Sequence, residues 1–346
     1  MSSGEESTIN VPFINPFGKT AASQVFFFSL LIIFMAVSPA QSCFPPGQPA
    51  KGPGGSDYSY NAIICNLYGS GAQGYYLFEP VVESDEQRPE SLPVIVFVHG
   101  LLLTNPDIYG GWINHIVRKG NIVIFPIYQT LFTPYGHFVT NVMASIKAAL
   151  EELHRDDHIR PDTTKFALVG HSCGGVLVVN VAALAGSAGL PLPDAIMAVA
   201  PGLSSAIGFE NLREIDSGTL LLATAGDADF MTRDVDARAI YQGTTNIHPD
   251  NKDLVIFRSD YHGFPFLVAG HFAPCGSTSD CGLCIGIDAL DYYGYWKLFE
   301  ALTDAAFDKI NREYALGNTD EQRDMGDWSD GTCVNELIVL DLDAEP

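Results

Sequence analysis

Six short runs of consecutive apolar residues recur along the chain, each followed by turn-forming or polar residues. These runs lie within positions 93–98, 121–126, 165–169, 194–200, 219–225 and 254–258. Continuous apolarity, rather than alternation, is typical of strands that are covered on both faces. Successive runs leave room for a helix between them, which is the rhythm of βαβ units. The pattern predicts an α/β fold with a mostly parallel, doubly wound central sheet and helices on both faces.

Five further segments carry helical or strand patterns. Apolar residues at helical spacing predict an amphipathic helix that ends near His154, and a closing helix over 290–307. Residues 106–119 predict a short helix before Gly120. Residues 74–78 are expected to form an early strand at a sheet edge, and residues 337–340 an added strand.

The first 42 residues predict a targeting segment. The apolar block 25–37 has the length of a signal-peptide core, and Ala40 and Ser42 supply small residues for cleavage before Cys43. The favoured interpretation is a secretory signal and an extracellular protein. The alternative is an uncleaved single-pass anchor with the catalytic domain outside the cytosol, because the block could extend from Ala21 to Ala40.

The remaining chain is expected to divide into three parts. Residues 43–57 are rich in Pro and Gly and predict a linker without its own core. Residues 58–316 carry the predicted sheet and helices and form the catalytic domain, and residues 317–346 are an acidic C-terminal extension.

The net charge restricts the classes of possible binding partner, and the cysteine content bears on the cellular compartment. A formal net charge of −23 disfavours nucleic acid and anionic membrane surfaces as partners. Of the seven cysteines, Cys173 is expected to be a buried thiol, which leaves an even number in a chain expected to be secreted. Up to three disulfides are therefore predicted, of unknown pairing. Their cysteines are Cys43, Cys65, Cys275, Cys281, Cys284 and Cys333. Zinc at Cys275, Cys281 and Cys284 is disfavoured, since no second ligand pair lies nearby, and no metal or cofactor is expected.

Gly170-His171-Ser172-Cys173-Gly174 follows one apolar run and precedes another, which is compatible with a helix. A strand, a sharp turn with serine between glycines, and a helix make up a nucleophile elbow. Glycine is expected at 170 and 174 because a side chain would collide with the adjoining strand or helix. Ser172 is therefore the candidate nucleophile.

A serine nucleophile needs a base, and the base needs an acid to orient it. In open α/β sheets such groups gather at the carboxyl ends of the strands, here in the order Ser, Asp, His. Asp227 and Asp229 both follow the run 219–225 and are the candidate acids. Asp229 is preferred, and Asp227 is the alternative. His262 follows the last run by four residues and is the preferred base, with His271 as second choice.

The remaining parts of the expected site are backbone groups. The N–H groups of Leu101 and Cys173 are the candidate oxyanion donors, because they follow the run 93–98 and the nucleophile. His99 and His171 are expected to shape their turns rather than transfer protons. The mechanism predicted is acyl transfer through an acyl-enzyme, with no cofactor.

These motifs resemble those of the α/β-hydrolase superfamily over roughly residues 92–307. The double glycine after Ser172 and the run from His99 to Pro126 are similar to an esterase branch that contains chlorophyllases, platelet-activating-factor acetylhydrolases and bacterial polyester hydrolases. Chlorophyllases usually carry Arg where this chain has Cys173, a departure that bears on the substrate. The resemblance implies a serine carboxylesterase or lipase.

The apolar loops at Leu101–Leu103, Phe132, Phe264 and Phe266 favour an ester with a hydrophobic acyl or alcohol group. Three alternatives remain: a chlorophyllase-type esterase, a peptidase on the same fold, and a non-catalytic binding protein that keeps the fold. Membrane contact is expected only through an uncleaved N-terminal anchor.

Overall fold

The computed structural model describes residues 43–84, 88–155, 157–277 and 286–342. These residues belong to one compact unit, Ser42–Pro346. The predicted signal or anchor, residues 1–42, lies outside the described residues, as do Cys281 and Cys284. None of the helices in the described ranges is long and apolar enough to cross a bilayer.

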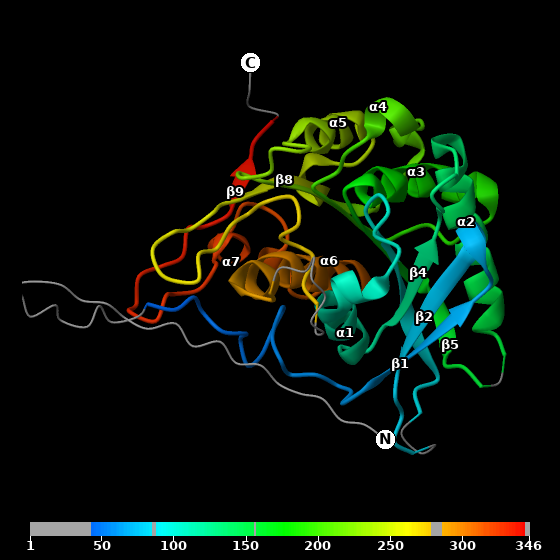
Figure 1. Ribbon diagram of the computed structural model, residues 1–346, viewed down its shortest axis with the longest axis horizontal. Coiled ribbons are helices and arrows are strands. Elements are labelled where there is room, and N and C mark those ends of the chain that lie inside the picture. Colours follow the sequence, from blue (N-terminus) through cyan, green and yellow to red (C-terminus); the bar gives the residue numbers. More distant parts are fainter. Residues whose placement is uncertain (1–42, 85–87, 156, 278–285, 343–346) are drawn as a thin grey trace, which may run out of the picture. The chain divides into compact units, whose positions relative to one another are not determined.

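One nine-stranded sheet runs through the molecule in the order β1-β2-β4-β3-β5-β6-β7-β8-β9 (Figure 1). The strands are β1 (Ile63–Tyr68), β2 (Gly74–Pro80), β3 (Ser91–Val98), β4 (Ile122–Ile127), β5 (Arg160–His171), β6 (Ala195–Val199), β7 (Leu220–Gly226), β8 (Lys252–Phe257) and β9 (Ile338–Leu340). The pairs from β4 to β8 are parallel, and β1, β2 and β9 add antiparallel pairs at the two ends. The predicted α/β fold with a mostly parallel sheet is confirmed.

Helices cover both faces of this sheet. The α-helices are α1 (Gly110–Arg118), α2 (Phe138–Glu152), α3 (Cys173–Ala188), α4 (Ser204–Ile207), α5 (Val235–Gly243), α6 (Lys297–Phe307) and α7 (Asp320–Arg323). A π-helix, η7 (Leu290–Trp296), leads into α6. Short 3₁₀ segments are η1 (Gly71–Gln73), η3 (Pro106–Tyr109), η4 (Tyr135–His137), η5 (Leu212–Glu214), η6 (Pro249–Asn251) and η8 (Arg312–Tyr314).

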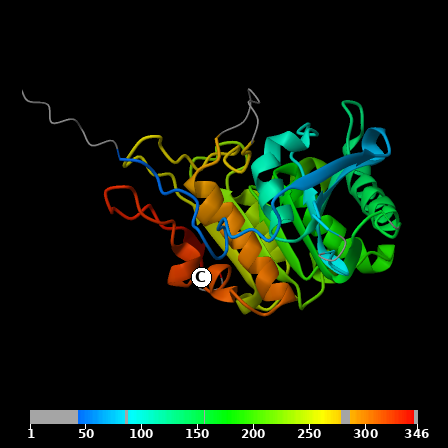
Figure 2. The ribbon, with the colours of Figure 1, turned by 90° about the horizontal axis from the view of Figure 1, so that it is seen from below.

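Alternate residues of each central strand enter different apolar layers. In β3, Ile95 and Phe97 pack with α1 and α6, whereas Val94, Val96 and Val98 pack with α2 and α3. Successive side chains of a strand point to opposite faces, so a run that is apolar at every position fills both layers. Figure 2 shows α6 lying across the strands on one face. The uninterrupted apolar runs of the sequence therefore correspond to strands buried on both sides.

The structure contains both of the outlying strands that the sequence predicts, but one of them is not at the edge of the sheet. The strand expected at 74–78 is β2, but it is not at the edge, because it pairs with β4 on one side and with β1 on the other. β1 was not predicted, and most of its residues are exposed. The added strand expected near the C-terminus is confirmed as β9, which pairs with β8.

Both terminal parts of the described chain pack on the domain. Met325, Trp328, Val334 and Leu337 are buried in the same apolar layer as α6. In the Pro- and Gly-rich segment, the Gly54 N–H donates to Glu300 Oε2 of α6 at 2.8 Å. The segments before residue 58 and after residue 316 thus share the compact unit of the sheet.

The described cysteines do not show the predicted disulfides. Cys43, Cys65, Cys275 and Cys333 are free thiols, as is Cys173. Cys173 is buried as expected, and burial raises the pKa of its thiol to about 11. A thiol with so high a pKa stays protonated and packs as a small apolar group.

Candidate active site

Ser172 lies at the turn between β5 and α3, in a strained backbone conformation. Its φ is 56° and its ψ is −119°, and α3 begins at the next residue. A Cβ on Gly170 would lie 2.3 Å from the Gly174 carbonyl oxygen, and a Cβ on Gly174 would lie 2.0 Å from that of Val98 in β3. Both contacts are far too short, so the turn requires glycine at both positions, as the sequence predicts. The strained turn presents the Ser172 side chain at the carboxyl edge of the sheet.

A histidine and an aspartate complete a hydrogen-bonded chain with this serine. The Ser172 hydroxyl lies 2.9 Å from His271 Nε2, and His271 Nδ1 lies 2.8 Å from Asp229 Oδ2. All three residues are buried, with 8%, 7% and 3% of their surfaces exposed respectively. His271 Nδ1–H donates to Asp229, so Nε2 is free to accept the serine proton. The geometry is that of a nucleophile, a base and an orienting acid.

His262, the base preferred from the sequence, does not lie at this position. Its Nε2 is 2.8 Å from Asp330 Oδ2, and its ring packs edge-on against Trp328. The histidine beside Ser172 is His271, the second choice. The preference for His262 was therefore wrong.

The reason lies in the path of the chain after β8. Asp260 and Leu267 exchange backbone hydrogen bonds of 2.7 and 2.9 Å, which closes a hairpin with His262 at its tip. The chain then returns beside the end of β7, where the Ala228 N–H donates to the Ala269 carbonyl at 3.1 Å. The short distance along the sequence from the end of β8 favoured His262. In the structure, the hairpin places His262 away from the serine, and the chain that returns from the hairpin places His271 beside it.

The sequence contains a weak signal that the chain returns to the end of β7. Gly226 lies so close to the returning chain that a Cβ there would be 2.0 Å from the Ala269 carbonyl oxygen. Glycine at the end of β7 and the small residues Ala269 and Gly270 before His271 fit such a close approach. Spacing alone did not reveal that these segments meet.

Asp229 is held as a carboxylate by four donors. Burial raises its pKa, but this is outweighed by the hydrogen bonds from His271 and Thr232, and the net pKa lies well below the ordinary value. Oδ1 accepts from the N–H groups of Met231 and Thr232 at 2.9 and 3.0 Å, and Oδ2 also accepts from Thr232 Oγ1 at 2.7 Å. A carboxylate fixed in this way can orient the imidazole and stabilise its protonated form.

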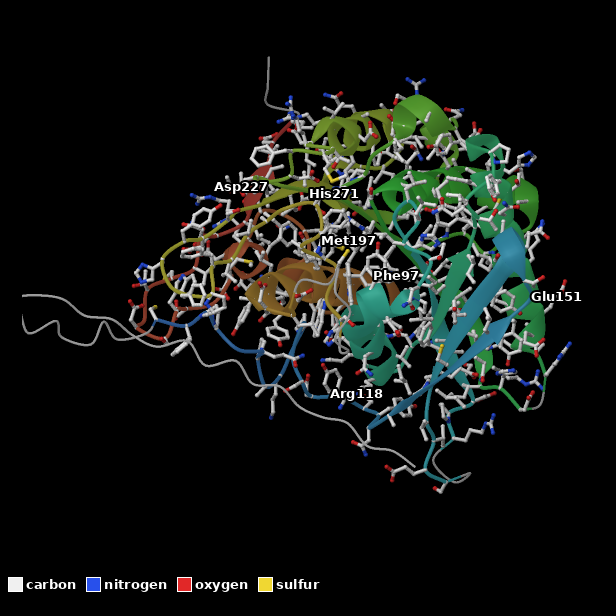
Figure 3. The ribbon with its side chains drawn as sticks, viewed as in Figure 1. Phe97, Arg118, Glu151, Met197, Asp227 and His271 are labelled. Carbon is white, nitrogen blue, oxygen red and sulfur yellow. The ribbon has the colours of Figure 1, made fainter. Side chains whose placement is uncertain are left out.

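Asp227, the alternative acid, has a different partner. Its carboxylate accepts from the Ser259 N–H at 2.9 Å and from Ser259 Oγ at 2.6 Å. It therefore fixes the chain at the start of the loop after β8. Figure 3 labels Asp227 and His271 at separate positions. The preference for Asp229 over Asp227 agrees with this geometry.

His171 connects the elbow to the other two loops of the site. The Gly100 N–H donates to the Tyr109 hydroxyl at 3.0 Å, Tyr109 donates to His171 Nδ1 at 2.8 Å, and His171 Nε2–H donates to the His271 carbonyl at 2.8 Å. Burial lowers the pKa of His171 to about 3, so the ring is neutral and has one donor and one acceptor nitrogen. It therefore positions the His271 backbone.

His99 has a similarly local role. Its Nδ1–H donates to the Gly100 carbonyl at 2.6 Å, and burial lowers its pKa to about 4. The Tyr128 ring stacks on it, with centroids 4.3 Å apart, and the Tyr128 hydroxyl donates to its carbonyl. The two histidines thus shape turns, as expected.

The two expected oxyanion donors lie in segments next to Ser172. The Cys173 N–H belongs to the first residue of α3, where backbone N–H groups have no acceptor within the helix. A Cβ on Gly100 would lie 3.3 Å from Ser172 Cβ, which shows how closely the loop after β3 approaches the serine. Leu101 and Ser172 line the same cavity.

That cavity has a volume of about 560 Å³ and opens to solvent beside Ser172 and His271. Apolar side chains on its wall include Leu101, Leu103, Met231, Val235 and Phe272. A second hollow of about 280 Å³ shares Leu101 and is lined by Leu102, Leu131, Phe132, Tyr135 and Phe138. The candidate site therefore has two adjoining apolar spaces.

The sheet order, the strand-to-helix turn and the carboxyl-edge site define an α/β-hydrolase fold. Over residues 79–213 the chain matches the family model described as Chlorophyllase, a family of the α/β-hydrolase superfamily. The matched segment includes Leu101, Ser172 and Cys173 and ends before Asp229 and His271. No curated protein matches the chain.

Proposed function

We propose that this protein is a serine carboxylesterase in which Ser172 is the nucleophile, His271 the general base and Asp229 the orienting acid. The observation that carries the proposal is the unbroken hydrogen-bonded chain from Ser172 Oγ through both ring nitrogens of His271 to Asp229. The family of the segment 79–213 supports ester hydrolysis as the reaction.

The reaction proceeds in two steps. In the first, Ser172 Oγ forms a bond to the ester carbonyl carbon while its proton passes to His271 Nε2. The tetrahedral intermediate collapses, the bond to the alcohol oxygen breaks, and His271 returns the proton to the leaving alcohol. In the second, His271 takes a proton from water as the water attacks the acyl-enzyme. The bond between the acyl carbon and Ser172 Oγ then breaks, and His271 returns the proton to Ser172 Oγ as the acid leaves.

The N–H groups of Leu101 and Cys173 are proposed to bind the negative oxygen of each intermediate. Each such donor contributes about 3 kcal/mol at the transition state when it is fixed in advance. The Tyr109 and His171 network supports this arrangement, because it ties Gly100, next to Leu101, to the backbone of His271.

The proposed substrates are esters with a hydrophobic acyl or alcohol group. Phe132 and Met231, which line the two hollows, are 88% and 67% exposed. Apolar side chains left in water at a cavity mouth favour an apolar ligand, because binding then removes both surfaces from water. With two apolar hollows that share Leu101, the acyl and alcohol parts can occupy separate spaces.

Hydrolysis of a p-nitrophenyl ester series by wild type and Ser172→Ala tests the proposal. We expect kcat/KM to rise from acetate to the medium-chain esters, and the variant to lose activity by a factor of about 10⁴ or more. Labelling by a fluorophosphonate probe should occur in wild type and be absent in the variant.

The controls separate the competing functions. A folded wild type that takes up no probe and cleaves no ester would indicate a binding protein. Faster cleavage of the matching p-nitroanilides than of the esters would indicate a peptidase. Preference for the acetate over longer esters would contradict the proposed apolar substrate class.

A further inference from the structure

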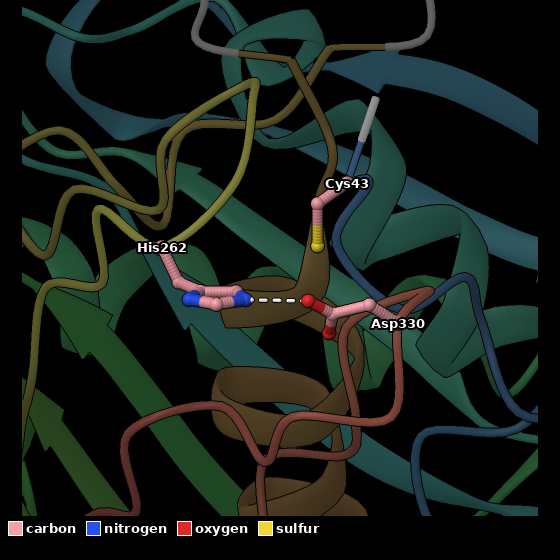
Figure 4. Close-up of side chains that lie close together, drawn as sticks. All are labelled: Cys43, His262 and Asp330. Atoms are coloured by element: carbon pink, nitrogen blue, oxygen red, sulfur yellow. Dashed lines mark hydrogen bonds and ion pairs between the residues drawn. The ribbon is translucent and has the colours of Figure 1, made fainter. Parts of the chain in front are cut away.

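A second cluster of chemically active side chains lies apart from Ser172. Cys43, His262 and Asp330 each offer a ligand atom, and these atoms lie within 4.8 Å of one another. Figure 4 shows the Cys43 sulfur pointing toward the hydrogen-bonded pair of His262 and Asp330. The three residues are far apart in the sequence and come from the N-terminal segment, the hairpin after β8 and the C-terminal segment.

Backbone contacts hold these three segments together independently of the cluster. The Phe264 N–H donates to the Cys43 carbonyl at 2.8 Å, which joins the hairpin to the N-terminal segment. Phe44 and Ser329 are joined twice, since the Ser329 N–H donates to the Phe44 carbonyl and the Phe44 N–H donates to Ser329 Oγ, both at 2.9 Å. The ligand atoms are thus brought together by a defined scaffold.

A close approach at Gly263 shows how tightly the scaffold is packed. A Cβ at this position would lie 2.4 Å from the Cys43 carbonyl oxygen and 2.5 Å from the Trp328 ring. Glycine next to His262 is therefore needed for the hairpin tip to reach both terminal segments.

The Asp330 carboxylate and the backbone at His262 are also held in place before any ligand binds. Asp330 Oδ1 accepts from the Thr332 N–H at 2.9 Å, which leaves Oδ2 directed at His262. The backbone N–H of His262 donates to Asp260 Oδ1 at 2.9 Å, and Asp260 Oδ2 accepts from Trp328 Nε1 and from the Asn335 N–H. A hydrogen bond to the second oxygen of a carboxylate, as at Asp330, is typical of carboxylates that ligate metals.

The donor set selects the kind of ion. One thiolate sulfur, one imidazole nitrogen and one carboxylate oxygen suit Zn²⁺, whereas Mg²⁺ and Ca²⁺ prefer oxygen ligands only. Cys43 is a free thiol with part of its surface exposed, so its sulfur is accessible to an ion. The side chains of His262 and Asp330 are 39% and 46% exposed, which provides entry from solvent.

We propose that Cys43, His262 and Asp330 form a zinc site, with water as the fourth ligand. Ligands at about 2.0 Å in a tetrahedral site are about 3.3 Å apart. The present 2.8 Å between His262 Nε2 and Asp330 Oδ2 must therefore widen by a few tenths of an ångström. Both side chains are exposed enough to make this movement.

The ion would join the two terminal segments to the loop that carries His271. His262 and His271 both belong to the chain between β8 and η7, and His262 lies within the Asp260–Leu267 hairpin that precedes His271. Zinc binding is therefore expected to stabilise the fold and to restrain this loop, while the ion itself lies outside the reaction.

Calorimetric titration of the full-length reduced protein with Zn²⁺ tests the site. We expect one ion per chain with micromolar or tighter affinity, and release of about one proton from Cys43, measured by repeating the titration in buffers of different ionisation enthalpy. Titration with Co²⁺ should give a near-ultraviolet band from sulfur-to-cobalt charge transfer. Zn²⁺ should also raise the melting temperature.

Four variants decide whether the binding belongs to this cluster. Cys43→Ser should abolish the sulfur-to-cobalt band, and His262→Gln and Asp330→Asn should each weaken Zn²⁺ binding at least about tenfold. Cys65→Ser, a change at an exposed free thiol on β1, should bind as wild type does. Melting of each metal-free variant checks that it is folded. Absence of binding by wild type, or equal binding by wild type and Cys43→Ser, would overturn the proposal.

Discussion

Two Asp–His pairs in this protein have the same interatomic distance and different surroundings. His271 and Asp229 are 2.8 Å apart, with side chains 5% and 0% exposed, and the second ring nitrogen of His271 contacts a serine. His262 and Asp330 are also 2.8 Å apart, with side chains 39% and 46% exposed, and their neighbour is a cysteine.

The comparison shows that proximity of a carboxylate and an imidazole does not define a role. In the buried pair, little of either side chain is exposed and the carboxylate is held by backbone donors, so the ring is fixed with Nε2 facing Ser172. In the exposed pair, solvent screens the charges and both side chains can reorient. The buried pair suits proton transfer, and the exposed pair suits ligation of an ion.

The largest expected effect comes from replacing each histidine in turn. His271→Ala should lower kcat for a p-nitrophenyl ester by a factor of about 10⁴, because Ser172 loses its base. His262→Ala should lower it by less than about threefold, since that ring does not contact the serine. Steady-state kinetics of both variants in buffer with a chelator measures the contrast. Comparable losses would mean that the two pairs do not differ in role.

The acids give a second and smaller contrast. Asp229→Asn should reduce kcat by about 10³ to 10⁴, because the amide no longer holds the His271 tautomer. Asp330→Asn should reduce it by less than about threefold. Asp227→Asn should cost roughly 1–3 kcal/mol of stability through its bonds to Ser259, with a small loss of kcat. Activity assays and urea unfolding of the three variants separate these effects. An Asp227 variant as inactive as the Asp229 variant would contradict the assignment.

The smallest expected effect is on the pH dependence of stability. The pKa of Asp229 is lower in the folded protein than its ordinary value near 3.9, so its contribution is complete above that value and is lost as the pH falls through the folded-state pKa. The difference in unfolding free energy between wild type and Asp229→Asn should be constant from about pH 5 to 8 and should shrink below about pH 4. Urea unfolding across this range measures it. Asp330→Asn should change the pH dependence of the unfolding free energy less than Asp229→Asn does, because solvent screens the exposed pair. A difference that grew toward acid pH would have the wrong sign.

The sequence predicted the parallel strands well because each of them is buried on both faces. Every residue of β6 is buried, and an uninterrupted apolar run is the direct result. β1 was missed because it is an outer strand with mostly exposed residues, so its side chains carry no such run. The disulfide prediction depended on an assumed compartment, and the described cysteines are free thiols.

The amino-acid sequence by itself determined the parallel strands of the sheet and the elbow around Ser172. Those features depend on local requirements: apolar side chains at every position of a covered strand, and no side chain at positions 170 and 174. Only the tertiary structure decided which histidine meets the serine. Hydrogen bonds between Asp260 and Leu267, and between Ala228 and Ala269, fold the loop after β8 back on itself, and contacts of this kind leave no periodic pattern in the sequence.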